Sequence, residues 1–142
     1  MRKLLVPIDS SDSSSRALQH AIDLARHSGP IELHLVYAHE PPVIYGEVAI
    51  YTSEAKAKEA QRLHSEDILN PAVAKVQAAG VPCKSEILIG NVPKAIVQYA
   101  EEKGCDAIVM GTRGMGAVGN LVMGSVATKV IHLTKLPVTL VK

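Results

Sequence analysis

The residues best suited to chemistry in this sequence form a glycine-rich segment near its carboxyl end, residues 111–125. Gly111, Gly114 and Gly124 are separated by two and by nine residues, and Ser125 follows directly. Glycine lets backbone N–H groups approach an anion that a Cβ would keep away. The segment follows a short aliphatic run and leads into a helical pattern, and the N-terminus of a helix favours negative charge. We therefore predict a phosphate-binding loop here.

The distribution of charge favours the same interpretation. The chain has 15 Lys and Arg against 14 Asp and Glu, a formal net charge of +1. No acidic residue follows Asp106, whereas four basic ones do: Arg113, Lys129, Lys135 and Lys142. A segment without carboxylates suits a phosphate, while the near-neutral total gives the protein no general attraction for nucleic acid or for an anionic membrane. The alternative is that the glycines only turn a tight loop.

Other phosphate-binding and catalytic motifs do not fit this segment. Residues 114–119 match GxGxxG, but a dinucleotide fingerprint closes the first strand and precedes an acidic residue, which is missing here. The segment has no lysine after a glycine as in a P-loop, and Ser125 lacks the GxSxG setting of a nucleophile. The six histidines do not have the spacing of metal ligands. We therefore expect no catalytic residue and no protein-held metal.

Aliphatic runs alternate with helical patterns along the chain, which is typical of a parallel sheet covered on both faces. We expect strands at about 4–8, 31–37, 83–89, 106–110 and 136–141, with helices between them. The longest helical pattern covers residues 53–79, and Pro71 inside it should kink or restart the helix. The predicted fold class is α/β, a single doubly wound, Rossmann-like, five-stranded parallel sheet with helices on both faces, in one domain of residues 1–142. Ligands should bind beyond the carboxyl ends of the strands.

The sequence does not predict export or membrane insertion. The apolar run at residues 4–8 is too short for the core of a signal peptide. The longest uncharged stretch, residues 114–128, contains four glycines and is shorter than the roughly 20 residues of a membrane span. Two cysteines, Cys83 and Cys105, cannot build a disulfide framework. We expect a cytoplasmic protein with no membrane contact and, since it has four Tyr but no Phe or Trp, no stacking platform for nucleic acid.

The G-x2-G-x9-G-S spacing of residues 111–125 resembles the nucleotide-binding signature of the universal stress protein family, in its ATP-binding type. The likeness covers the chain, because the Val-Pro-Ile-Asp of residues 6–9 and the Leu-Pro-Val of residues 136–138 stand where the family has similar segments. The resemblance implies the adenine nucleotide alpha-hydrolase-like variant of the fold. It also implies an ATP site, with any Mg or Mn ion held through the phosphates.

The resemblance also carries over the nucleotide contacts of the family, position by position. The glycine loop would wrap the ribose and triphosphate, Pro7 and Asp9 would meet the adenosine, and Val36 would offer backbone groups to the adenine edge. Arg113 either adds a charge at the triphosphate or lies in solvent, and Asp9 either accepts from the nucleoside or caps the first helix. Ser10 departs from the pattern, since many relatives have glycine there. The implied set is Pro7, Asp9, Val36, Gly111, Thr112, Arg113, Gly114, Met115, Gly116, Gly124, Ser125, Val126 and Ala127.

Three functions are compatible with this pattern. The first is a regulatory module of the stress response, in which ATP shifts a conformation or dimer that an unidentified partner protein reads. The second is a slow ATPase or phosphate-transferring enzyme, which needs a base to position water, yet the loop has no Asp, Glu, Gln or His. The third is a structural dimer without nucleotide, against which the complete motif argues. The last strand is expected at a sheet edge, and the resemblance implies a homodimer through Pro137 to Val141.

Overall fold

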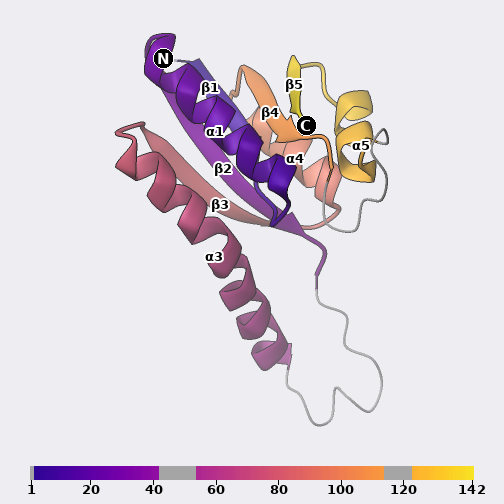
Figure 1. The fold of residues 1–142 in the computed structure, drawn as a ribbon. Helices are drawn as coiled ribbons and strands as arrows, with labels where there is room; N and C mark the ends of the chain where they lie inside the picture. Colours follow the sequence, from indigo (N-terminus) through magenta and orange to yellow (C-terminus); the bar gives the residue numbers. More distant parts are fainter. Residues whose placement is uncertain (1, 42–53, 114–122) are drawn as a thin grey trace.

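Parallel strands alternate with helices throughout the computed structural model, which describes residues 2–41, 54–113 and 123–142 (Figure 1). The strands are β1 (Arg2–Pro7), β2 (Ile31–His39), β3 (Cys83–Ile89), β4 (Ala107–Gly111) and β5 (Val138–Val141). The helices are α1 (Asp12–His27), α3 (Glu54–Ala78), α4 (Val92–Glu102) and α5 (Ser125–Leu133). These elements agree with the predicted order of strands and helices.

The five strands form one sheet in the order β3-β2-β1-β4-β5, and every neighbouring pair is parallel. Helices α1 and α3 cover one face, and α4 and α5 cover the other (Figure 1). The predicted doubly wound α/β fold is thus confirmed. The chain leaves β1 toward one edge of the sheet and β4 toward the other, so the direction of winding changes between these two strands.

The central strands are aliphatic because both of their faces are covered. Successive residues Leu4, Leu5 and Val6 of β1 are all buried and alternate between two apolar cores. Leu4 and Val6 pack under α1 and α3, whereas Leu5 packs under α4 and α5. A continuous apolar run, rather than a strict alternation, is what a strand buried on both sides requires.

Helix α3 continues through Pro71, so of the two predicted effects at this residue, a kink or a restart of the helix, the restart does not occur. Proline removes only one backbone donor, and the helix is anchored on both sides of it by buried Leu69, Ala72 and Val76. The amino-terminal half of α3 is exposed and charged, with ion pairs such as Lys58–Glu54. Among the described helices, none is both long and apolar enough to cross a membrane.

A histidine in the middle of β2 belongs to a buried polar network. His34 is 2% exposed, and its Nε2 donates to Glu32 Oε1 at 2.6 Å. Its Nδ1 forms a second hydrogen bond with the Tyr99 hydroxyl of α4, 2.9 Å away. The hydrogen bond from His34 lowers the pKa of Glu32. His34 therefore has a structural role, and its two ring nitrogens are both used within the fold.

Candidate functional site

The carboxyl ends of β1 and β4 lie side by side at the place where the sheet changes its direction of winding. The connection after β1 leads to α1 on one face, and the one after β4 leads toward α5 on the other. In open α/β sheets, ligands bind in the crevice that forms at this point. Pro7 and Asp9 come from the first of these ends, and Gly111, Thr112 and Arg113 come from the second.

The two ends of the glycine-rich segment are joined at their base. The Gly124 N–H donates to the Thr112 carbonyl at 2.6 Å, and the Thr112 N–H donates to the Val141 carbonyl of β5 at 2.9 Å. Thr112 therefore connects the start of α5 with the edge strand. Of the predicted site residues, Gly114, Met115 and Gly116 lie outside the residues that the structure describes.

Helix α5 begins beside this base with backbone donors available. Its N-cap residue, Gly124, has no side chain to accept from them, and Ser125 is exposed in the first position. Ala127 is buried and Val126 half-buried, and both belong to the apolar core under α4 and α5, which fixes the direction of the first turn. The first N–H groups of a helix have no intrahelical partner and favour an anion. The start of α5 therefore presents N–H donors without intrahelical partners, and phosphate binding there stays a prediction.

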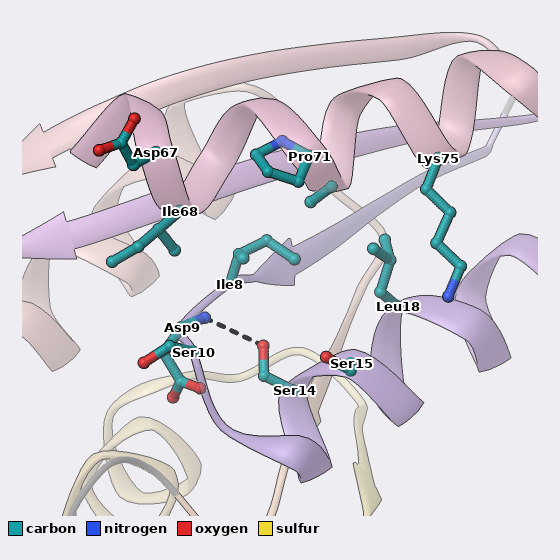
Figure 2. A pocket seen from close by; sticks show the side chains of 11 residues that line it. Ile8, Asp9, Ser10, Ser14, Ser15, Leu18, Asp67, Ile68, Pro71 and Lys75 are labelled. Carbon is teal, nitrogen blue, oxygen red and sulfur yellow. Dashed lines mark hydrogen bonds between the residues drawn. The ribbon is translucent and has the colours of Figure 1, made fainter. Parts of the chain in front are cut away.

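The carboxylate of Asp9 is held in the turn after β1. Asp9 Oδ1 accepts from the Ser11 N–H at 2.7 Å, and the Asp9 N–H donates to Ser14 Oγ at 3.0 Å (Figure 2). The N-cap of α1 is Ser11, whose side chain accepts from the Ser14 N–H. Of the two roles considered for Asp9, helix capping thus belongs to Ser11, and the second oxygen of Asp9 has no hydrogen-bond partner among the described residues. Burial, followed by the charge of Asp9, raises the pKa of nearby Tyr37.

The departure at Ser10 does not disturb the turn. No non-glycine residue in the described ranges has a positive φ, so Ser10 adopts an ordinary backbone conformation. Glycine is needed only where φ is positive or where a neighbour approaches too closely for a Cβ. The turn after β1 therefore accepts serine at this position.

The backbone of Val36 is already engaged in the sheet. Its carbonyl oxygen accepts from the Ile8 N–H at 2.7 Å, and it lies in register with Pro7. The Val36 side chain is fully buried in the core under α4 and α5, while Pro7 is half-buried. An adenine that bonds to the Val36 carbonyl would have to share this acceptor with the Ile8 N–H. The sequence alone does not show that the carbonyl is already used.

One residue of the site is absent from the sequence-based set. Ser13 in the first turn of α1 is 4% exposed, and its hydroxyl donates to the Arg113 carbonyl at 2.7 Å. The Arg113 N–H in turn donates to Ser13 Oγ at 3.2 Å. A Cβ on Gly111 would lie 2.4 Å from Ser13 Oγ and 2.7 Å from its backbone carbon. Gly111 is therefore required because α1 approaches it closely.

Comparison with known proteins identifies the family. A family model described as the universal stress protein family matches residues 1–142. The chain belongs to the universal stress protein family. A member of this family from Thermus aquaticus is 35% identical over 142 residues, which cover 99% of this chain and 98% of that protein.

Two solved structures of universal stress proteins are similar in fold as well as in sequence. One, from Archaeoglobus fulgidus, is in complex with dAMP and matches with a TM-score of 0.70 and 26% identity, covering 100% of this chain and 98% of that one. The other is in complex with cAMP and matches with a TM-score of 0.69 and 26% identity, covering 99% of this chain and 97% of that one.

Proposed function

We propose that this universal stress protein binds an adenine nucleotide, ATP foremost, where β1 and β4 end. The observation that carries this proposal is the meeting of two complementary groups at one point of the sheet. Helix α5 begins with backbone donors that its glycine N-cap leaves without a side-chain partner, and the Asp9 carboxylate stands at the neighbouring strand end. The backbone donors of α5 suit phosphates, and the Asp9 carboxylate suits the hydroxyl groups of a ribose.

The remaining residues have consistent roles in such a complex. The phosphates would lie against the N–H groups of residues 125–127, with Thr112 to Gly116 and the Arg113 charge around them. The base would lie over the strand ends at Pro7 and Val36, against aliphatic and not aromatic side chains. The complexes of related universal stress proteins with dAMP and with cAMP support an adenine nucleotide as the ligand.

We further propose that binding serves as a signal and not as a source of energy. A rapid ATPase needs a side chain that positions water at the γ-phosphate, and residues 111–125 contain no Asp, Glu, Gln or His. No group of three His, Cys, Asp or Glu side chains in the described part of the chain is placed to hold a metal. An Mg²⁺ or Mn²⁺ ion would therefore be held mainly through the phosphates.

The bound nucleotide would act on other proteins through the dimerisation of this protein. Strand β5 is an edge of the sheet, and its unpaired backbone groups can pair with a second copy. We propose a homodimer through Pro137 to Val141, recognised by a further protein, with residues 1–142 acting as one domain. Cys83 and Cys105 are both free, which fits the reducing cytoplasm that we propose as its compartment.

The test of this function is nucleotide binding by wild type and by two glycine variants. Gly114→Val and Gly124→Val each place a side chain in the phosphate-binding segment, so both should lose ATP binding in calorimetry while keeping the circular dichroism of the fold. Ala74→Val, at an exposed position of α3, is the matched control. Equal ATP affinity in all four proteins, or no nucleotide binding by wild type, would contradict the proposal. Phosphate release well above about one per second, the low end for enzymes, would contradict the signalling role.

A further inference from the structure

A pocket lies between α1 and α3, on the sheet face opposite to α4 and α5 (Figure 2). Its volume is about 310 Å³, which is at the lower end of the range for small-molecule sites. We call it the α1–α3 pocket, and the residues that determine its chemistry are Ile8, Leu18, Ala72, Ser14, Ser15 and Lys75.

The base of the α1–α3 pocket is apolar. Ile8 at the end of β1, Leu18 of α1 and Ala72 of α3 all belong to the core under these helices and are less than one-tenth exposed. Ile68 and Pro71 of α3 continue the same lining (Figure 2). Water finds few hydrogen-bond partners against such a surface, so an aliphatic group gains free energy by replacing it.

Hydrogen-bond donors without acceptors border this apolar base. Ser14 is 3% exposed; its Oγ accepts from the Asp9 N–H, but its own hydroxyl proton has no acceptor among the described residues. Ser15 and Lys75 are exposed, and the Ser15 hydroxyl and the Lys75 ammonium have no hydrogen bond or ion pair to protein within the described ranges, so a ligand can reach them. Figure 2 shows the Lys75 side chain extending from α3 toward α1. Ser14 lies at the Asp9 end of the pocket, so an anionic group of a ligand would be attracted to the Lys75 ammonium at the other end.

The acidic residues of the α1–α3 pocket restrict the ligand to a single negative charge. Asp9 and Asp67 line the end remote from Lys75, and Figure 2 shows the Asp67 carboxylate turned away from α1. A second anionic group, or a phosphate, would be repelled at that end. Lys75 follows Asp67 by eight positions, about 12 Å along the helix. The apolar base between them therefore suits a chain of medium length.

We propose that the α1–α3 pocket binds an aliphatic monocarboxylate of medium chain length. Its carboxylate lies beside Lys75, and its chain covers Ile8, Leu18 and Ala72. Octanoate is a suitable probe, because its extended length is comparable to the two turns of α3 that line the pocket.

The proposal is tested by titrating octanoate into the ¹⁵N-labelled full chain at pH 7 without nucleotide, so that the result does not depend on the glycine loop. Amide shifts should concentrate at Ile8, Ser14, Ser15 and Ala72. Lys75→Gln should weaken binding about fivefold, as expected for a partly exposed ion pair, whereas Lys94→Gln on the opposite face should not change it. Ser15→Leu should remove binding, because it places an apolar side chain in the mouth of the pocket.

Three results would overturn this assignment. The first is octylamine binding as tightly as octanoate, since the donors would then not select an anion. The second is unchanged octanoate affinity in both Lys75→Gln and Ser15→Leu, with their folding verified by the spectra. The third is amide shifts that are as large around the exposed Leu63 and Ile89 as around the pocket, which would show non-specific association with apolar surface.

Discussion

The Ser13 hydroxyl and the Arg113 backbone form two hydrogen bonds with each other, although the residues are 100 positions apart in the chain. Ser13 Oγ donates to the Arg113 carbonyl at 2.7 Å and accepts from the Arg113 N–H at 3.2 Å. This pair connects the first turn of α1 directly with the start of the glycine-rich loop. It therefore fixes the two halves of the candidate nucleotide site relative to each other.

Ser13→Ala should reduce both stability and nucleotide affinity. The substitution removes both hydrogen bonds between the Ser13 hydroxyl and the Arg113 backbone, and the loss of two such bonds costs about 1–3 kcal/mol. The free energy of unfolding in urea should fall by this amount, and ATP binding measured by calorimetry should weaken because the loop is held less firmly. Ser15→Ala, at an exposed position of the same helix, is the control. If the two variants have the same stability and affinity, the Ser13–Arg113 pair does not position the loop.

Gly111→Ala should destabilise the fold even without a ligand. The new Cβ would lie 2.4 Å from Ser13 Oγ and 2.7 Å from the Ser13 backbone carbon, so α1 must move. Overpacking of this kind costs about 1–3 kcal/mol. Combining Gly111→Ala with Ser13→Ala removes the contact with the hydroxyl but not the one with the backbone. Most of the destabilisation by Gly111→Ala should thus persist in the Ser13→Ala background, as measured by urea unfolding of the four proteins in this cycle. If Ser13→Ala instead restored full stability to Gly111→Ala, the clash would not be with the backbone.

Tyr99→Phe should change how stability depends on alkaline pH. Burial, followed by the charge of Glu86, raises the pKa of Tyr99 to about 12 in the folded protein, from the ordinary value of 10.0. The folded state therefore keeps this proton where the unfolded state loses it, and stability falls as pH rises above about 10. Near neutral pH the variant should be less stable than wild type, because His34 loses the Tyr99 hydroxyl.

The difference between the two proteins should then shrink as pH rises through this window, as measured by urea unfolding at pH 7, 9 and 11. Tyr37→Phe separates the two effects: its pKa is also raised by burial, so its pH dependence should change in the same direction, but it should cost little at neutral pH because its hydroxyl has no hydrogen bond in the described residues. A constant difference between wild type and Tyr99→Phe at all three pH values would mean that Tyr99 does not titrate differently on folding.

Thr139→Lys should dissociate the proposed homodimer. Thr139 is exposed on β5, in register with Val109 of β4, and a lysine on an edge strand opposes pairing with another chain. Sedimentation at micromolar concentration should show a dimer for wild type and a monomer for the variant. Ser85→Lys, exposed on the other edge strand β3, should remain dimeric. A monomeric wild type rejects the dimer, and a dimeric Thr139→Lys variant places the interface elsewhere.

Much of the fold could be predicted because its signals are local. The continuous apolar run of β1 and the turn residues around each strand follow from burial and from backbone geometry within a few positions. Of the kink or restart predicted at Pro71, the restart does not occur, since the local rule does not include the buried contacts of Leu69 and Val76 that keep α3 intact. The serine run after Asp9 suggested only caps, so Ser13 was not distinguished from its neighbours.

The sequence by itself determined the order of strands and helices, the spacing of the glycines and the aliphatic character of the core. Tertiary structure alone decided that Gly111 faces Ser13, that Ser11 rather than Asp9 caps α1, and that a pocket opens between α1 and α3. Periodicity and turn chemistry act between residues a few positions apart, so they can be read along the chain. The approach of α1 to the end of β4 depends on sheet order and helix packing, which bring together residues whose separation in the sequence carries no local signal.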